Sequence, residues 1–289
     1  RYDSHVAPFA GDQHQVSPRV RLNFFPDPAN TVYLYYGRLF VPTNIEDLRA
    51  ITSAADSGVV ESPTLPERDD FYEMGYIHRF PFGVVAKLSA YHKASSPGID
   101  DNTIPGSAIT TSVNIQHVRI TGLEAAFEVR PPGPVSGYVN FALNHAYGYG
   151  TITGGFFPSA PPQSDFDLDH DQRVSALASA VYSAHQFYLG ATGIYGSGLT
   201  NGLTPDPSDP SLPSYGTGLF DFDSGYKVDP SVILNLSAGY SLLVGCTIVR
   251  PQVYVDNVFD KAYILKGAFF SGASIGRPRT VQVRLDVSY

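Results

Sequence analysis

The segment from Asp165 to Asp171 holds the residues whose types and spacing come nearest to a metal site. Asp165, Asp167, Asp169, His170 and Asp171 place donor side chains at short intervals. Their carboxylate oxygens would suit a hard cation such as calcium. The segment lacks the glycine and glutamate positions of an EF-hand loop, and charged residues are also expected where a strand leaves a membrane. We therefore expect no metal ion here.

Other residue types that carry out catalysis are present without the spacing that catalysis needs. No two of the eight histidines have the HxxxH or HExxH spacing of a zinc site. No G-x-S-x-G elbow frames a serine nucleophile, and a Ser-His-Asp triad is defined by geometry, which an inventory of residues does not supply. The single cysteine, Cys246, excludes an internal disulfide and a CxxC site. The sequence therefore predicts neither an enzyme nor a bound cofactor.

Aromatic side chains in two segments rich in glycine, proline and serine are the best candidates for ligand contact. Exposed aromatics among polar residues bind a ligand through several weak contacts. The segments lean acidic, with Asp221 and Asp223 among the aromatics, and this disfavours strongly anionic ligands. We expect substrate contact from Phe156, Phe157, Tyr215, Phe220, Phe222 and Tyr226.

The composition excludes some classes of protein. The 289 residues are 43% hydrophobic, which is compatible with a packed fold, but only 16% charged, well below a typical soluble domain. A net charge of -8 without a long basic run argues against a nucleic-acid partner. No window approaches the length of apolar sequence that a transmembrane helix requires. Strands, however, cross a membrane with a much weaker signal.

The candidate residues lie between segments in which apolar and polar residues alternate. In 280–289, Val281, Val283, Leu285, Val287 and Tyr289 alternate with polar residues. Successive side chains of a strand point to opposite faces, so this segment has one apolar and one polar face. We expect about twelve strands and no helix. The pattern is clear at 72–80, 84–90, 123–129, 135–143, 231–241 and 249–256, and fainter at 19–25, 31–40, 173–184, 186–197 and 1–6.

The connections between these strands alternate in length. Short turns are expected at 26–30, 80–83, 130–135, 183–186 and 242–245, and long connections at 41–66, 95–110, 149–169, 198–228 and 259–276. In an up-and-down antiparallel arrangement, all short turns then lie at one end and all long connections at the other. This asymmetry is typical of outer-membrane barrels. The sequence therefore predicts an all-β, antiparallel up-and-down transmembrane β-barrel, with the apolar faces toward lipid.

A soluble β-sandwich is the alternative, since it shows the same alternation with the apolar faces packed inward. The strands are longer than those of ordinary sandwiches and suit a tilted crossing of a bilayer. Tyrosine and phenylalanine also end the apolar faces near the expected rims, as an aromatic girdle would. Pro251 counts against a closed barrel, because a proline between two neighbouring strands removes a ladder hydrogen bond. A bulge or an edge position would relieve that conflict.

Several motifs resemble those of TonB-dependent outer-membrane receptors. Asn257, Val258, Phe259, Asp260, Lys261 and Tyr263 match the family's N-(L/V)-F-(D/N)-K-x-Y motif, and Gly276, Pro278 and Arg279 match its G-x-P-R motif before a last strand that ends in an aromatic residue, here Tyr289. Segments 17–42, 118–131, 168–173 and 191–202 are also similar to the family's strands, in the family's order.

The resemblance implies a receptor that takes up a scarce nutrient across an outer membrane, such as a ferric siderophore, cobalamin or an oligosaccharide. Such receptors are about twice as long and have about twenty-two strands, so we expect residues 1–289 to be one partial barrel domain, the C-terminal half. Implied partners are membrane lipid, an N-terminal plug domain, the inner-membrane TonB complex, and a small-molecule or metal-chelate ligand. No residue here matches the plug or the TonB box. A self-contained twelve-stranded outer-membrane channel or hydrolase barrel is the alternative.

Charged residues on the polar faces are expected to line the interior of the barrel. In water-filled barrels such residues tune selectivity. In the receptors that the chain resembles, they would pair with the plug. The residues concerned are Glu73, Arg79, Lys87, Glu124, Glu128, Arg130, Arg250, Asp256, Arg284 and Asp286.

Overall fold

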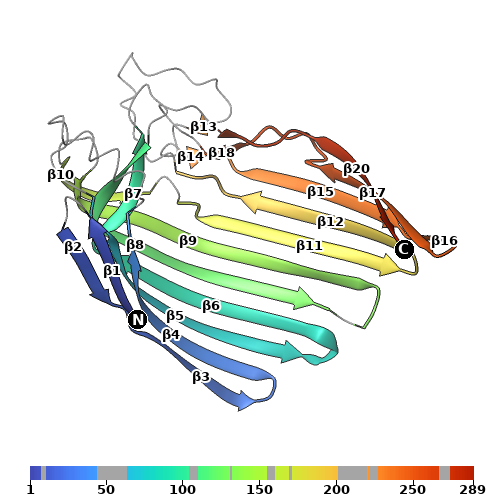
Figure 1. The fold of residues 1–289 in the computed structure, drawn as a ribbon, viewed down its shortest axis with the longest axis horizontal. Coiled ribbons are helices and arrows are strands. Elements are labelled where there is room, and N and C mark those ends of the chain that lie inside the picture. The colour runs from blue at the N-terminus through green and yellow to red at the C-terminus, as the bar shows by residue number, and fades with distance from the viewer. Residues whose placement is uncertain are drawn as a thin grey trace.

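The protein is built around one large, curved antiparallel β-sheet (Figure 1). A computed structural model describes residues 1–7, 11–43, 64–103, 110–130, 132–154, 160–168, 171–200, 220–221, 227–266 and 274–289. The described part contains no helix of the length and apolarity that crossing a membrane requires. Its only helical element is the single 3-10 turn η1 (Pro81–Gly83).

Consecutive strands pair with each other along the chain, as an up-and-down sheet requires. The order is β3-β4-β5-β6-β8-β9-β11-β12-β15-β17-β20, with β7, β10 and β16 pairing at the ends of β8, β9 and β17. The bounds are β3 (Arg19–Asp27), β4 (Asn30–Val41), β5 (Glu67–Phe80), β6 (Val84–Ser95), β7 (Gly98–Thr103), β8 (Thr110–Val129), β9 (Val135–Thr153), β10 (Ala160–Asp167), β11 (Val174–Ala184), β12 (Phe187–Gly196), β15 (Ser231–Tyr240), β16 (Leu242–Val244), β17 (Thr247–Asp256) and β20 (Thr280–Ser288).

Three small hairpins flank the large sheet. They pair β1 (Tyr2–Ala7) with β2 (Gly11–Val16), β13 (Phe220–Asp221) with β14 (Lys227–Val228), and β18 (Ile264–Lys266) with β19 (Ser274–Ile275). Within the described residues, β3 and β20 each have one partner strand, so the large sheet is open at both edges. The expectation of an all-β, up-and-down antiparallel wall of about twelve strands is confirmed.

The short turns lie at one end of the sheet and the long connections at the other (Figure 1). Several expected boundaries were wrong. The expected connections 198–228 and 259–276 contain the short strands β13, β14, β18 and β19. Residues 242–244 form strand β16, and the turn follows at Gly245, whose φ of 63° suits glycine. Parts of 95–110 and 149–169 are strand, in β7, β8, β9 and β10, because a hairpin that extends beyond an apolar environment can be polar on both faces.

The two faces of the sheet differ as the alternation predicts. We call the face that carries Leu34 and Met74 the outer face, and the face that carries Tyr33 and Glu73 the inner face. Met74 and Leu123 on the outer face are 58% and 49% exposed. No second sheet covers these side chains within the described structure, so the sandwich alternative was wrong. Among the described residues, buried apolar side chains are few and gather mainly toward the long connections, as at Val113, Ile115, Val118 and Ala146.

Pro251 is accommodated by a gap in the ladder between β15 and β17. Gly239 pairs with Gln252 and Leu242 pairs with Val249, so the register is the same on both sides of the gap and no bulge is present. Pro251 falls opposite the interruption, where a backbone N–H is not needed. Its other neighbour is Leu285 on β20.

Candidate functional site

The register places the charged residues that alternation predicted on the inner face, and several of them lie close together. Lys87 Nζ lies 3.9 Å from Glu73 Oε1, across β5 and β6. Arg284 Nε lies 2.7 Å from Asp286 Oδ1 on β20, and Asp286 is opposite Arg250 in the register. Opposite charges are therefore interleaved along this wall, which gives it many hydrogen-bonding groups and no large field of one sign.

Tyr33 on β4 lies flat against the inner face and organises one polar cluster. Its hydroxyl donates a hydrogen bond to Glu73, and its side chain is only 1% exposed. The Arg21 guanidinium lies 4.1 Å from the ring centroid, and Lys87 Nζ lies 5.8 Å from it. Gly75 makes room for the ring, because a Cβ there would come within 2.3 Å of it.

A second polar cluster with the same design lies on β12, β17 and β20. Tyr188 lies over Gly239, where a Cβ would come within 2.2 Å of the ring. The Tyr188 hydroxyl donates to Gln252 Oε1 at 3.1 Å, and Gln252 Nε2 donates to Asp286 Oδ2 at 2.6 Å. Sequence reasoning missed these clusters. The available signal was a tyrosine on one strand and a glycine at the facing position of the next, which only the register aligns.

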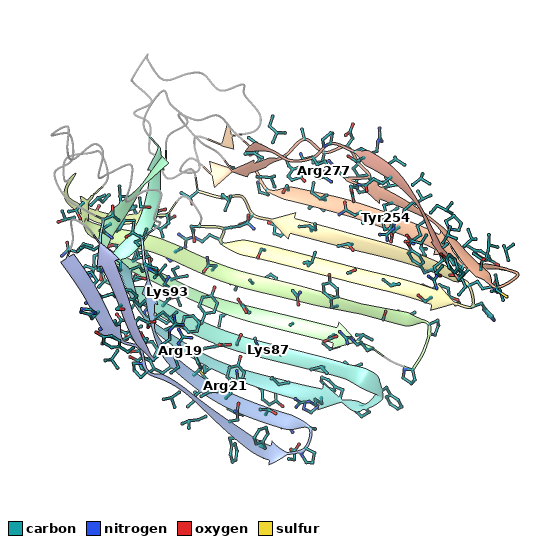
Figure 2. All side chains as sticks on the ribbon, viewed as in Figure 1. Arg19, Arg21, Lys87, Lys93, Tyr254 and Arg277 are labelled. Atoms are coloured by element: carbon teal, nitrogen blue, oxygen red, sulfur yellow. The ribbon has the colours of Figure 1, made fainter. Side chains whose placement is uncertain are left out.

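A third cluster of charges lies on the inner face toward the long connections. Lys93 Nζ lies 2.6 Å from Glu67 Oε1 and 3.2 Å from Asp69 Oδ2. The three residues come from β5 and β6, and Figure 2 shows Lys93 on this part of the wall. On the outer face of β5, Met74 and Tyr72 are followed toward the long connections by Asp70, where the apolar surface ends. Asp69 is next to Asp70 on the strand and therefore lies outside the membrane-spanning segment. Burial raises the pKa of the Asp69 carboxyl to about 6, and the charge of Glu67 adds to that effect.

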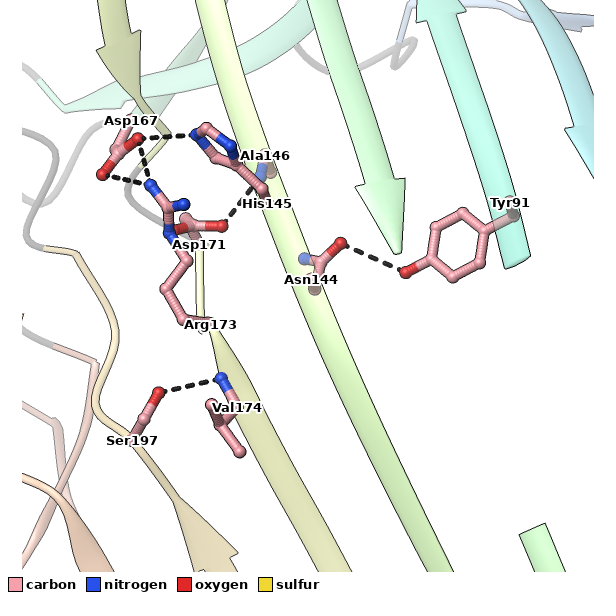
Figure 3. Close-up of polar contacts among 9 residues, drawn as sticks. All are labelled: Tyr91, Asn144, His145, Ala146, Asp167, Asp171, Arg173, Val174 and Ser197. Carbon is pink, nitrogen blue, oxygen red and sulfur yellow. Dashed lines mark hydrogen bonds and ion pairs between the residues drawn. The ribbon is translucent and has the colours of Figure 1, made fainter. Parts of the chain in front are cut away.

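In the acidic segment that was considered as a metal site, Asp167 and Asp171 bind the guanidinium group of Arg173 (Figure 3). Arg173 Nη2 donates to both oxygens of Asp167, at 2.8 and 2.9 Å, and Arg173 Nε donates to Asp171. Asp171 is fully buried and also accepts a hydrogen bond from Ala146 N at 2.7 Å. Asp169 and His170 lie outside the described residues, and no group of three potential metal ligands occurs among those that are described.

The Asp167–Arg173 pair fixes the start of β11 to β9 and β10. His145 Nε2 lies 3.1 Å from Asp167 Oδ1, which adds a contact from β9. Burial alone would raise the pKa of Asp167, but the hydrogen bonds and charge of Arg173 hold it below its ordinary value. The contacts of Asp167, Asp171 and Arg173 thus join β9, β10 and the start of β11.

The aromatic residues expected to contact substrate lie almost entirely outside the described part of the chain. Phe220 is described only as backbone, in β13, which pairs with β14 at the long-connection end. Their role in binding stays a prediction. The residues outside the described ranges are Phe156, Phe157, Tyr215, Phe222 and Tyr226.

The motif around Asn257 joins the two described ends of the connection between β17 and β20. Asn257 Nδ2 donates to Lys261 O at 2.9 Å and to Arg277 O at 3.1 Å, and its Oδ1 accepts from Lys261 N at 2.9 Å. Asp260 Oδ1 accepts from Arg279 N at 2.8 Å. The Tyr263 ring covers Gly276, where a Cβ would approach within 2.0 Å. Asn257, Asp260, Tyr263 and Gly276 of the motifs therefore have a structural role.

Comparison with solved structures finds the same fold within longer chains. A mutant of the ferric enterobactin receptor PfeA from Pseudomonas aeruginosa is 15% identical, with a TM-score of 0.61, over 97% of this chain and 41% of that chain. The siderophore receptor PiuA from Acinetobacter baumannii is 15% identical, with a TM-score of 0.66, over 95% and 36%. The copper transporter OprC is 14% identical, with a TM-score of 0.64, over 98% and 42%.

The chain thus spans about two fifths of the length of these proteins. A search of curated proteins finds no match. A family model described as TonB dependent receptor-like, beta-barrel matches residues 1–258. Together with the single curved sheet and the motifs described above, this match shows that the chain belongs to the TonB-dependent receptor β-barrel family.

Proposed function

We propose that residues 1–289 form the C-terminal part of the barrel of an outer-membrane receptor that takes up a scarce nutrient. Candidate cargoes are a ferric siderophore, cobalamin or an oligosaccharide. The observation that carries the proposal is the pairing of an apolar outer face with an inner face of interleaved charges, in a chain of this family. The apolar face suits lipid, and the charged face suits an interior that holds water and protein.

Energy for uptake would come from outside this chain. In the proposed receptor, a plug domain fills the interior against the inner face, and the inner-membrane TonB complex drives release of the cargo. The polar clusters around Tyr33 and Tyr188 would give the plug a wall of fixed hydrogen-bonding groups. The receptor would catalyse no covalent reaction. Cargo would first contact the aromatic residues of the long connections, among them Phe156 and Phe157.

Uptake by the complete gene product tests this function. Cells that lack their own receptors would express it, and accumulation of labelled ferric siderophores, cobalamin and maltooligosaccharides would be measured with and without an uncoupler of the proton-motive force. We expect accumulation of one class, abolished by the uncoupler. Replacing Phe156 and Phe157 by alanine should weaken binding by about tenfold. Replacing Phe82, an exposed phenylalanine at the opposite, short-turn end, should leave binding unchanged.

Other outcomes would contradict the proposal. Accumulation that ignores the uncoupler and follows the outside concentration would support a passive channel. A failure of every class of cargo, with the protein correctly inserted in the outer membrane, would leave the uptake function without support. Equal effects at Phe82 and at Phe156 with Phe157 would refute the assignment of the binding residues.

A further inference from the structure

The charge cluster of Glu67, Asp69 and Lys93 lies where β5 meets the corner between β6 and β7. Glu67 is 8% exposed and Asp69 is 1% exposed. The two carboxylates share one ammonium group, because Lys93 Nζ lies 2.6 Å from Glu67 Oε1 and 3.2 Å from Asp69 Oδ2. With both carboxylates ionised, the cluster would carry one unbalanced negative charge, which burial makes costly. A single bound proton would remove that charge.

Two buried oxygen atoms of this corner have no hydrogen-bond partner among the described residues. They are Asp69 Oδ1 and Ser95 Oγ. Asp69 and Ser95 are directly opposite each other in the register of β5 and β6. Both side chains are at most 1% exposed, so this chain already covers them and a domain that packs on the inner face does not reach them. A proton on the Asp69 carboxyl would supply a donor for the Ser95 hydroxyl.

Asp69 is the carboxyl of the cluster that holds this proton. Both oxygens of Glu67 already have donors, since Oε1 accepts from Lys93 Nζ and Oε2 accepts from Ile99 N at 2.7 Å. Asp69 has only the longer contact with Lys93. Burial and, after it, the negative charge of Glu67 raise the pKa of Asp69 to about 6. Asp69 therefore changes its charge between mildly acidic and neutral pH.

The neighbouring strands place no second cation against the cluster within the described structure. The residues of β4 and β8 opposite the cluster in the register are apolar, namely Leu39, Val41, Val118 and Ile120. On the outer face, Arg68 of β5 donates to Gln13, and His117 and Arg119 of β8 contact Ser96 Oγ and Ser95 O. The titratable residues of β7 are Asp100 and Asp101, which are acidic. The charge balance therefore depends on Lys93.

Glu67 joins the cluster to β7, which begins the β7–β8 hairpin at the long-connection end (Figure 1). Besides the bond from Ile99 N to Glu67, two backbone bonds hold this corner to β5: Ser96 N donates to Arg68 O at 2.9 Å, and Arg68 N donates to Pro97 O at 3.2 Å. The cluster therefore lies beneath the corner, and the carboxylates would meet water only if the corner opened.

We propose that the cluster of Glu67, Asp69 and Lys93 is a pH-sensitive contact that holds the corner between β6 and β7 closed in mild acid and releases it toward neutral pH. A neutral Asp69 leaves Lys93 to Glu67, which holds Ile99. An ionised Asp69 leaves a buried negative charge that water relieves only when the corner opens. Because the pKa of Asp69 is raised in the closed corner, its stabilising effect is complete below about pH 4 and is lost as the pH rises through about 6.

The proposal goes beyond the uptake function and does not depend on it. It concerns the opening of the β7–β8 hairpin, which belongs to the connections that we propose cargo meets first. The mobility of that hairpin would follow the pH outside the cell. Its test needs no cargo, so a failure of uptake and a failure of this proposal are separate results.

Hydrogen exchange of the complete protein in lipid nanodiscs, between pH 5 and 7, tests the proposal. The exchange rate of peptides from 96–103 in the native protein would be divided by the rate in Asp69→Asn at each pH, so that the intrinsic pH dependence of exchange cancels. With a pKa of about 6 in the closed corner and an ordinary one in the open corner, this ratio should rise about tenfold from pH 5 to 7. The same ratio for peptides from β11 and β12 should stay constant.

Two further variants separate the cluster from its surroundings. Glu67→Gln removes the second carboxylate, while its amide oxygen still accepts from Ile99 N. Its rate, divided by that of Glu67→Gln with Asp69→Asn, should rise less than about fourfold over the same range. Asp70→Asn is the matched control, because Asp70 is the next residue on β5 but accepts from the Tyr36 hydroxyl on the outer face, at 2.8 Å. The ratio of native to Asp70→Asn should not change with pH.

Several results would overturn the proposal. They are a native to Asp69→Asn ratio that is constant from pH 5 to 7, an equal rise in β11 and β12, which would mean opening of the whole sheet, and an equal effect of Asp70→Asn. If Asp69→Asn does not fold, the ratio of native to Glu67→Gln decides, and it should rise about threefold from pH 5 to 7. A constant value of that ratio would likewise overturn the proposal.

Discussion

Replacing Asn257 by alanine should release the connection between β17 and β20 while the sheet itself stays folded. The Asn257 side chain is 1% exposed and makes hydrogen bonds to Lys261 N, Lys261 O and Arg277 O. The residue also has a φ of 49°, in the left-handed region that asparagine tolerates better than alanine. One substitution therefore removes three hydrogen bonds and adds backbone strain.

The expected cost follows from these contacts. Each buried backbone group left without a partner costs about 1–3 kcal/mol, and water that enters the opened connection recovers part of this. Alanine at a positive φ adds about 1 kcal/mol. A total of about 3 kcal/mol corresponds to a roughly hundredfold rise in local opening. Glycine at the same position loses the hydrogen bonds without the strain, so Asn257→Gly should open roughly fivefold less than Asn257→Ala.

Hydrogen exchange of the complete protein in lipid nanodiscs, read by mass spectrometry, measures this opening. Peptides from 257–266 and 274–279 should exchange about a hundredfold faster in Asn257→Ala, and peptides from β5 and β6 should be unchanged. Asn23→Ala is the control, because Asn23 makes only an exposed side-chain contact, with Arg21. Exchange that stays at the native rate in Asn257→Ala would refute the reasoning on the hydrogen bonds. Equal rates for alanine and glycine would refute the strain argument.

Further predictions concern the two faces and the charge cluster on β5. Leu123→Arg should destabilise the protein in phospholipid vesicles by about 2–4 kcal/mol in urea titrations, and Ser237→Arg on the inner face by less than about 1 kcal/mol; the reverse order would contradict the assignment of the faces. Gly75→Ala should displace the Tyr33 ring and cost about 1–3 kcal/mol, with Tyr33→Ala largely suppressing that added cost; an additive double variant would show that the two do not collide. Because the folded-state pKa of Asp69 is raised to about 6, the folded state binds more protons than the unfolded state between about pH 4 and 6. The free energy of unfolding of the native protein should therefore fall by about 1–3 kcal/mol relative to that of Asp69→Asn as the pH rises through this window. Urea titrations of both proteins from pH 4 to 7 measure this difference. A difference that stays constant over this range would refute the raised pKa of Asp69.

The sequence by itself determined the two faces of the sheet and the two ends of the strands. Alternation is a local property, because neighbouring side chains on a strand always point to opposite faces. The pattern in 280–289 therefore assigned Val281 to the outer face and Arg284 to the inner face without knowledge of any partner strand. The lengths of the connections likewise required only the chain itself. The family was predicted from motifs such as Asn257 to Tyr263, although their physical role was not.

Only the tertiary structure decided which residues of the inner face meet. The contact of Tyr33 with Glu73 and the space for its ring at Gly75 depend on the register between β4 and β5, which lie far apart in the sequence. The acidic segment binds Arg173 in a fixed position because His145 and the Ala146 N–H on β9 contact Asp167 and Asp171. Alternation says which way a side chain points, but the pairing of strands distant in sequence says what it points at.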